Sequence, residues 1–309
     1  MTGTGARALV TGGAGFVGSH LVDRLLADGY GVCVLDDLST GSTRNVSPNA
    51  EFHRVDICDA PPLHDVVTRF RPEVVFHAAA QTDVRRSVRE PDFDARVNVV
   101  GGLNVLRAAA AAGARRIVYA SSAAVYGNPA RVPVSESEPT RPISEYGASK
   151  LAFEHYLGAY AARGLIEYAA LRYANVYGPR QGSTGEAGVV SIFTRQMIAG
   201  EPVTIFGDGS KTRDYVFVDD VVEATVRAAT GPSGVVANVG WGREVSDLEL
   251  FRAVAAAAGY SGQPTYGPDR RGDVARSCLD GALAQRTWGW RPSVPVVDGV
   301  RRVVEYART

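Results

Sequence analysis

Short apolar runs alternate with amphipathic stretches over the first half of the chain. The amphipathic stretches repeat apolar residues with the period of a helix, and the apolar runs between them have the length of buried strands. This alternation is typical of parallel strands joined by crossover helices. We predict strands at residues 8–11, 31–36, 51–55, 74–77, 116–121 and 167–173. Helices are predicted at residues 17–28, 62–70, 93–112 and 146–162.

The pattern changes after about Asn175, where glycine, proline and loop residues become dense. Helices are predicted there at about 189–199, 218–229, 246–258 and 297–307. We therefore expect an α/β protein with a doubly wound parallel sheet and a smaller, mixed α/β domain. The first domain is predicted at residues 1–175 and the second at 176–309, with the segment at about 214–239 returning to the first. Ligands are expected along the carboxyl edge of the sheet.

The composition is that of an ordinary globular protein, and its charge balance disfavours two classes of partner. Lysine plus arginine equals aspartate plus glutamate at 33 each. The chain therefore has no excess charge that would favour binding to nucleic acid or to a membrane surface. No apolar run reaches the roughly 20 residues that span a bilayer. Cys33, Cys58 and Cys278 are scattered without metal-ligand spacing, which indicates reduced thiols and no metal site. We expect a cytoplasmic protein.

A glycine-rich turn follows the first predicted strand. Gly12, Gly15 and Gly18 lie between that strand and an amphipathic helix, which is the context that a dinucleotide-binding fingerprint requires. Glycines let the backbone approach a pyrophosphate, and the helix N-terminus supplies N–H groups. Asp36 ends the second strand 18 residues past Gly18, close to the spacing of about 20 for a ribose-binding carboxylate. A carboxylate there favours NAD over NADP, although the nearby Arg44 leaves NADP open. The alternative for the glycines is a tight turn.

Residues at other strand ends suggest further cofactor contacts, each with an ordinary alternative. Asp37 also fits a solvated loop, and Asp56, followed by Ile57, also fits a cap or turn. Three small side chains end the fourth strand, where they would let a cofactor lie against the backbone but equally suit tight packing. These residues are Ala78, Ala79 and Ala80.

Three residues form a candidate catalytic group. Tyr146 and Lys150 are four residues apart and therefore share one face of a predicted helix. A free tyrosine has a pKa of about 10, and a lysine ammonium one turn away, together with the positive charge of an oxidised nicotinamide, would favour the phenolate. Ser122, at the end of a strand, would hydrogen-bond the same substrate hydroxyl. Each residue alone also fits a structural role. Together, after a dinucleotide turn, they predict oxidation and reduction of an alcohol carbon with a nicotinamide cofactor.

The chain resembles a known family over nearly its whole length. It is similar to the extended short-chain dehydrogenases/reductases and, within them, to the bacterial UDP-glucose (UDP-galactose) 4-epimerases. The residues that carry the resemblance are 11–20, 77–88, 98–101, 121–127, 146–150, 171–180, 205–209, 213–215 and 270–273. The resemblance implies a Rossmann-type NAD-binding domain followed by a UDP-sugar-binding domain.

The resemblance also implies a role for each matching residue. Tyr146 would be the base, Lys150 would hold the nicotinamide ribose and lower the tyrosine pKa, and Ser122 would assist. The additional cofactor contacts that it implies are Phe16, Val17, Asn98, Ser121 and Tyr173. The substrate contacts that it implies are Asn175, the backbone at Val189 and Val190, Thr204 and Phe206 around the uracil, Arg213 and Arg270 on the diphosphate, and Asp273 on the uridine ribose. A guanidinium suits bidentate phosphate recognition, although a surface ion pair is the commoner role of an arginine.

The residues after Ser122 distinguish the reactions that pass through a 4-keto sugar. In the family that the chain resembles, 4,6-dehydratases carry an Asp-Glu pair after the catalytic hydroxyl residue, and related decarboxylases keep a Glu there. This chain has Ala123 and Ala124, which cannot exchange protons, so we predict a 4-epimerase. Oxidation at C4 by NAD would be followed by hydride return to the opposite face of the sugar.

The substrate is less sharply defined. By resemblance, Ser277 gates the space for the 2-substituent of the sugar, and its small size predicts that N-acetylated UDP-hexoses fit as well as UDP-glucose and UDP-galactose. The alternative is that neighbouring loops close this space. UDP-glucuronate is a further candidate, disfavoured by the sequence at residues 83–87.

Two further expectations concern function class and assembly. A non-catalytic, NAD-sensing protein on the same fold is the alternative from another class, although the chain keeps both Tyr146 and Lys150. By resemblance, the helices at about 93–112 and 146–162 would pair two copies into a homodimer. Their apolar residues equally suit packing on the sheet.

Overall fold

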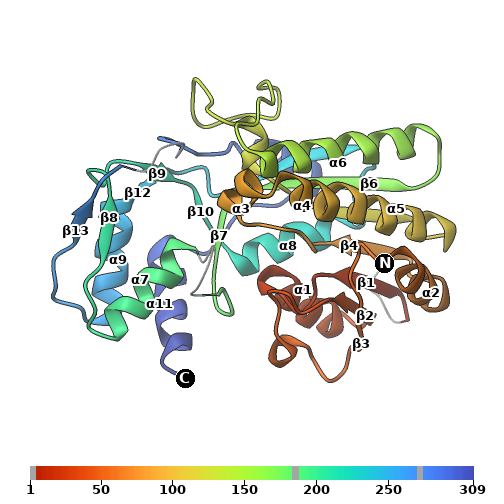
Figure 1. The fold of residues 1–309 in the computed structure, drawn as a ribbon, viewed down its shortest axis with the longest axis horizontal. Coiled ribbons are helices and arrows are strands. Elements are labelled where there is room, and N and C mark those ends of the chain that lie inside the picture. Colours follow the sequence, from red (N-terminus) through yellow and green to blue (C-terminus); the bar gives the residue numbers. More distant parts are fainter. Residues whose placement is uncertain (1–4, 183–187, 270–273) are drawn as a thin grey trace.

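A seven-stranded parallel sheet forms the centre of the larger part of the molecule (Figure 1). The computed structural model describes residues 5–182, 188–269 and 274–309. The strand order is β11-β6-β5-β4-β1-β2-β3. The strands are β1 (Arg7–Thr11), β2 (Gly31–Asp36), β3 (Glu51–Arg54), β4 (Val74–His77), β5 (Arg116–Ser122), β6 (Glu167–Tyr173) and β11 (Val235–Val239). The predicted doubly wound, Rossmann-type sheet is confirmed. The order reverses between β4 and β1, where such sheets bind ligands.

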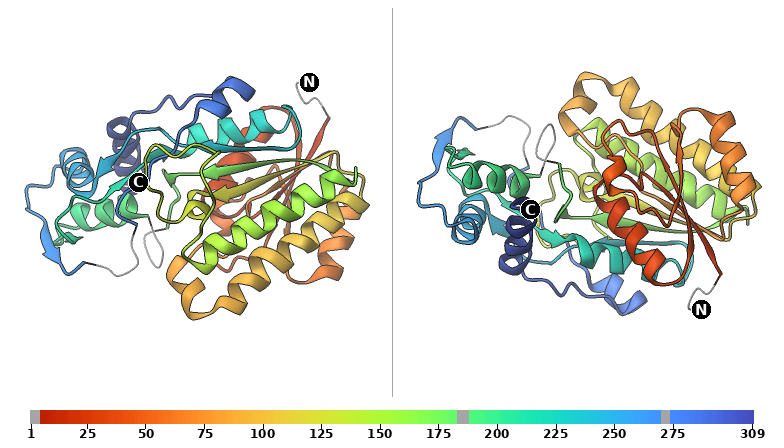
Figure 2. Two further views of the ribbon diagram at one scale, coloured as in Figure 1. Left: turned by 90° about the horizontal axis from the view of Figure 1, so that it is seen from above. Right: turned by 90° about the horizontal axis from the view of Figure 1, so that it is seen from below.

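Helices cover both faces of this sheet (Figure 2). One face packs against α1 (Phe16–Ala27) and α8 (Val218–Ala228), and the other against α2 (Ala60–Phe70), α5 (Gly102–Ala111) and α6 (Glu145–Ala162). The strands supply side chains to both cores because successive residues point to opposite faces. Along β1, for example, Val10 joins the first core and Leu9 the second.

The helix predicted at 93–112 is three consecutive segments in the structure. They are α4 (Pro91–Ala95), a π-helix (Arg96–Gly101) and α5. The short helix α3 (Val84–Arg89) precedes them and was not predicted, because six residues are too few to show a period. Its first turn is capped by the Asp83 side chain, which accepts a hydrogen bond from the Arg86 N–H at 2.6 Å. A π-turn inside a helix is frequent at functional sites.

A smaller body of helices and short strands lies beside the sheet, at the left of Figure 1. It contains α7 (Val189–Ile198), α9 (Asp247–Ala258) and α11 (Val296–Ala307), with β8 (Thr204–Phe206) paired to β13 (Thr265–Gly267). The linking elements are β7 (Asn175–Tyr177) paired with β10 (Tyr215–Phe217), β9 (Thr212–Arg213) paired with β12 (Val245–Ser246), and α10 (Ala282–Trp288). These strands of two or three residues carry no alternation, so the sequence did not predict them.

The long predicted helices of this second half are present close to their expected positions. The best-defined start is that of α9, where Ser246 and Glu249 form a reciprocal capping box. Within the described chain, none of the helices has both the length and the apolar character needed to cross a bilayer.

Candidate active site

The glycine turn joins β1 to α1 at the carboxyl edge of the sheet. Gly12 has a φ of +72°, and a Cβ on it would lie 2.6 Å from the backbone nitrogen of Ala79. A Cβ on Gly18 would collide with the carbonyl oxygen of Gly12. Helix α1 begins at Phe16 without a side-chain cap, so the N–H groups of its first turn, Phe16 and Val17 included, have no side-chain acceptor. The turn therefore presents bare backbone and a positive helix end.

Asp36 and Asp37 lie beside this turn. The carboxylate of Asp36 accepts hydrogen bonds from the backbone nitrogens of Ala14 at 3.0 Å and Leu38 at 2.8 Å. Burial raises the pKa of this carboxyl, although the two N–H donors oppose the effect. Asp37 instead accepts from the backbone and hydroxyl of Ser39 in an exposed turn. Asp36 is thus fixed against the glycine turn, whereas Asp37 is occupied with its own loop.

Of the other predicted cofactor residues, some lie beside the glycine turn and some have other roles. Residues 78–80 follow β4 and lie against the glycine turn, with the N–H of Ala78 donating to the carbonyl of Thr11 at 3.1 Å. Asp56 is exposed and accepts a hydrogen bond from the N–H of Cys58 at 2.8 Å, as expected for a turn residue. Ile57 is buried in the core beneath α2 and α5.

The candidate catalytic residues come from β5 and α6. Ser122 ends β5 and accepts a hydrogen bond from the N–H of Ala124 at 3.1 Å. Ser144 caps α6 by accepting from the N–H of Gly147, which places Tyr146 and Lys150 in the first turns of that helix. A Cβ on Gly147 would lie 2.5 Å from the carbonyl oxygen of Ala124. Glycine is required there because α6 and the segment after β5 approach so closely.

Burial dominates the electrostatics of the tyrosine and the lysine. Burial raises the pKa of Tyr146 to about 12, and its hydrogen bond with Ser122 lowers it only in part. Burial lowers the pKa of Lys150 to about 8. The Lys150 Nζ donates to the carbonyl of Ala120 at 2.9 Å and lies 5.7 Å from the centroid of the Tyr146 ring. In the chain alone, burial therefore outweighs the Ser122 hydrogen bond, which lowers the Tyr146 pKa.

Three other predicted cofactor contacts have their polar groups engaged within the protein. The Ser121 hydroxyl donates to Glu154 Oε1 at 2.5 Å, and the Tyr173 hydroxyl shares a 2.7 Å hydrogen bond with Thr225. The Asn98 amide contacts the backbone of Gln81, as well as the side chains of Asp94 and Ser149. These contacts indicate that the three polar groups stabilise the protein structure around the site.

A buried polar network behind the catalytic residues was not predicted. Arg172 on β6 donates to both carboxylate oxygens of Glu154 on α6, at 3.0 and 2.6 Å, and to the Tyr126 hydroxyl at 2.8 Å. Tyr126 in turn donates to Asn238 on β11 at 2.7 Å. The network joins four segments of the chain, from Tyr126 to Asn238, and none of these residues lies in a motif that suggests a structural ion pair.

The predicted substrate residues lie on the second body and its connections. Asn175 on β7 is exposed, and α7 begins at Val189 without a side-chain cap, followed by the buried Val190. The Thr212 carbonyl accepts two hydrogen bonds, one from the Arg213 guanidinium on β9 at 2.8 Å and one from the N–H of Ser277 at 3.2 Å. The structure therefore brings Arg213 and Ser277 onto neighbouring chain segments.

The remaining predicted substrate residues are less informative. Thr204 and Phe206 lie on β8, where the Thr204 hydroxyl is paired with that of Thr265 at 2.8 Å. Arg270 and Asp273 lie outside the described residues. Asp214, between β9 and β10, was missed by sequence reasoning. Its buried carboxylate accepts three backbone N–H groups, from Trp241, Gly242 and Leu279, and so connects the segments around the substrate residues.

Comparisons with known proteins agree with this geometry. The model of the "NAD dependent epimerase/dehydratase family" matches residues 8–240, which run from β1 to the residue after β11. The chain belongs to this family. It is 50% identical over 310 residues to the UDP-glucose 4-epimerase of Mycolicibacterium smegmatis, covering 98% of each chain.

Solved structures of epimerases are also closely similar. The UDP-glucose 4-epimerase of Thermotoga maritima, solved with UDP-glucose, matches with a TM-score of 0.96 and 45% identity over 98% of each chain. The Thermus thermophilus enzyme, solved with NAD, matches with a TM-score of 0.93 and 44% identity over 98% of this chain and 99% of that one. The resemblance seen in the sequence is confirmed.

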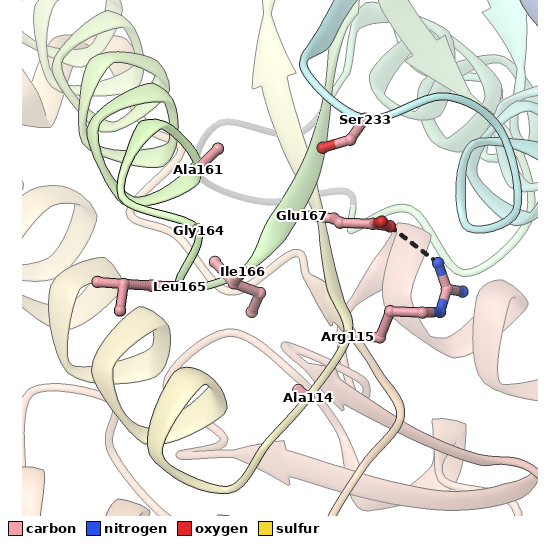
Figure 3. A pocket seen from close by; sticks show the side chains of 8 residues that line it. All are labelled: Ala114, Arg115, Ala161, Gly164, Leu165, Ile166, Glu167 and Ser233. Atoms are coloured by element: carbon pink, nitrogen blue, oxygen red, sulfur yellow. Dashed lines mark hydrogen bonds and ion pairs between the residues drawn. The ribbon is translucent and has the colours of Figure 1, made fainter.

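A separate pocket lies at the amino edge of the sheet, opposite the edge that carries the candidate active site (Figure 3). It has a volume of about 290 Å³ and lies where β5 and β6 begin, whereas Ser122 ends β5. Arg115 and Glu167 form a 3.0 Å ion pair at its rim. Its position at the amino edge separates it from the candidate active site.

One group of potential metal ligands occurs among the described residues. Ligand atoms of Cys33, Glu51 and His53 lie within 4.8 Å of one another at the β2–β3 edge. His53 and Glu51 are already hydrogen-bonded at 2.6 Å, and burial raises the pKa of the Cys33 thiol to about 12. A thiol that is protonated at neutral pH is a poor metal ligand.

Proposed function

We propose that the chain catalyses NAD-dependent 4-epimerisation of a UDP-hexose, with UDP-glucose and UDP-galactose as substrates. The observation that carries the proposal is the joint placement of the glycine turn and of Ser122, Tyr146 and Lys150 at the carboxyl edge of one sheet. The proposal is supported by the UDP-glucose 4-epimerases at 44–50% identity over nearly the whole chain.

The glycine turn fits a dinucleotide. The space beside Gly12 leaves no room for a Cβ, and the uncapped first turn of α1 offers N–H groups to a pyrophosphate. Asp36 beside this turn suits a ribose hydroxyl and repels a 2′-phosphate, which favours NAD. When bound there, NAD would supply a reversible hydride acceptor for C4 of the sugar.

The protein's own part in the reaction is proton transfer and orientation. Tyr146 takes the proton of the C4 hydroxyl and later returns it, and Ser122 hydrogen-bonds the phenol. The Lys150 ammonium, anchored on the carbonyl of Ala120, provides the positive charge that favours the phenolate. Epimerisation also requires that nothing else in the site reacts with a 4-keto sugar. Ala123 and Ala124, which follow Ser122, have no group that exchanges protons.

We also propose that N-acetylated UDP-hexoses are substrates. The proposal is supported by Ser277, which has a small side chain and lies next to the strand that carries Arg213. The test is proton NMR of the protein with NAD and either UDP-galactose or UDP-N-acetylgalactosamine, with Tyr146→Phe as control. Conversion of both sugars by the unaltered protein supports the proposal. Conversion of UDP-galactose alone refutes the proposal for N-acetylated sugars, and conversion of neither refutes the epimerase.

A homodimer in the cytoplasm is the proposed state of the protein. Val100 in the π-helix and Tyr156 on α6 are 47% and 41% exposed, which supports a contact through these helices. Phe153 and Leu157, apolar residues of the same helix, are instead fully buried against the sheet. The three free cysteines are compatible with a reducing compartment. A stable monomer at micromolar concentration in light scattering would refute the dimer.

A further inference from the structure

A buried carboxylate lies behind the catalytic residues without an established role. Asp94 on α4 is 1% exposed. Its Oδ1 accepts hydrogen bonds from Gln81 Nε2 at 2.9 Å and Asn98 Nδ2 at 3.1 Å, whereas its Oδ2 has no hydrogen-bond partner in the described chain. The Asn98 amide also donates to Ser149, the neighbour of Lys150, at 3.1 Å. A short chain of contacts therefore joins Asp94 to the catalytic turn of α6.

The charge of Asp94 is not neutralised as that of its buried neighbour is. Glu154 is held by two hydrogen bonds from the Arg172 guanidinium. Among residues 5–182, 188–269 and 274–309, no cation lies within 4.0 Å of Asp94 in an ion pair. A buried carboxylate without a cation is costly, so a nearby buried ammonium is its natural counter-charge.

Lys150 is the ammonium that Asp94 acts upon. Asp94 is the largest of the influences that raise the pKa of Lys150 against burial, followed by Glu154. The titratable or charged groups near Lys150 come from five packed elements. They are Tyr146 and Glu154 on α6, Tyr119 on β5, His77 on β4, Asp94 on α4 and, beyond Glu154, Arg172 on β6.

We propose that Asp94 is a positioning residue that keeps the Lys150 ammonium charged in its buried site and thereby sets the pH range of the reaction. The inference rests on the proposed function for the roles of Lys150 and Tyr146. Asp94 also raises the pKa of Tyr146. Removing its charge without changing its shape therefore lowers the pKa of both catalytic groups, because each negative neighbour stabilises the protonated form.

The composition of the chain makes the lysine charge directly measurable. Lys150 and Lys211 are the only two lysines among 309 residues. Protein labelled with lysine carrying ¹⁵N at Nζ therefore gives two side-chain signals, which Lys211→Arg assigns. Lys211 pairs with Asp269 outside the catalytic group and serves as the internal reference. A titration followed by NMR reads the protonation of Lys150 without any turnover.

The variant to compare is Asp94→Asn, with Asp92→Asn as the matched control. Asp92 lies on the same short helix and is exposed. We expect the pKa of Lys150, about 8 in the unaltered protein, to fall by roughly one unit in Asp94→Asn and to stay unchanged in Asp92→Asn. The Lys211 signal should titrate identically in all three proteins. An unchanged Lys150 titration in Asp94→Asn would overturn the proposal.

The pH profile of turnover provides the second readout. Both limbs of the kcat/KM profile should move to lower pH in Asp94→Asn, because Tyr146 and Lys150 shift in the same direction. A merely structural role would lower the plateau and leave the limbs in place, which would also overturn the proposal. If Asp94→Asn does not fold, Asp94→Ser is used. If neither folds, a Lys150 that is neutral at pH 7 in the unaltered protein refutes the proposal, and a charged one supports it.

These readouts separate the inference from the proposed function. A shifted Lys150 titration in a protein that turns over no UDP-sugar would support the Asp94 interaction and refute the epimerase. Turnover with an unshifted titration would do the reverse.

Discussion

Glu154→Gln is expected to destabilise the protein far more than the loss of any surface ion pair. The carboxylate is 5% exposed and its partner Arg172 is 8% exposed. Three hydrogen bonds reach it, two from Arg172 at 3.0 and 2.6 Å and one from Ser121 at 2.5 Å. A neutral amide at this position leaves the guanidinium charge buried without its counter-charge. Removing one partner of such a pair costs about 3–5 kcal/mol.

The assay is thermal unfolding followed by circular dichroism. With 309 residues, the unfolding entropy near 60 °C is about 0.65 kcal/mol per kelvin. The expected loss therefore lowers Tm by roughly 5–8 °C. Asp298→Asn, which breaks an exposed ion pair with Arg301, is the control and should lower Tm by less than about 2 °C. The double variant Glu154→Gln/Arg172→Met should recover part of the loss, because no charge is left buried. If Glu154→Gln behaved like the control, the reasoning about buried charge would be refuted.

Three further predictions concern the candidate site. Tyr146→Phe should lower kcat by roughly 10²–10⁴-fold while NAD still binds, as measured by NMR turnover and calorimetry; near-normal turnover would refute the base. Gly12→Ala should weaken NAD binding more than tenfold because its Cβ meets Ala79, whereas Gly113, with a similar φ of +77°, has no atom near its Cβ position and Gly113→Ala should bind normally; equal affinities in calorimetry would refute the role of the glycine turn in NAD binding. Asp214→Asn should lose about 1–3 kcal/mol in urea unfolding, because the amide cannot accept three N–H groups; an unchanged midpoint would contradict this.

The long elements could be predicted from the sequence because their signals are local. The apolar runs of β1, β2, β4 and β6 are each flanked by turn residues, and the glycine pattern lies where a strand meets a helix. The π-helix could not be predicted in the same way. It contains Asn98, whose side-chain amide hydrogen-bonds the backbone of Gln81 and the hydroxyl of Ser149, 51 residues away, and such contacts leave no local pattern in the sequence.

The candidate site was predictable only as far as its motifs extend. Ser122, Tyr146 and Lys150 belong to a pattern with a chemical reason, whereas Asp94 and Glu154 read as ordinary helix-surface charges. Their burial follows from tertiary packing, which brings Ser121 to Glu154 across 33 residues. The pKa of Tyr146 likewise depends on desolvation, which a helical spacing of four residues does not reveal.

The most direct test of the central claim follows the hydrogen at C4. UDP-galactose deuterated at C4 is incubated in ordinary water with the protein and NAD, and the UDP-glucose formed is examined by NMR. Transient oxidation with return of the same hydride predicts UDP-glucose that keeps its deuterium at C4. Product carrying solvent hydrogen at C4, or reduced cofactor accumulating without epimer, would contradict the account.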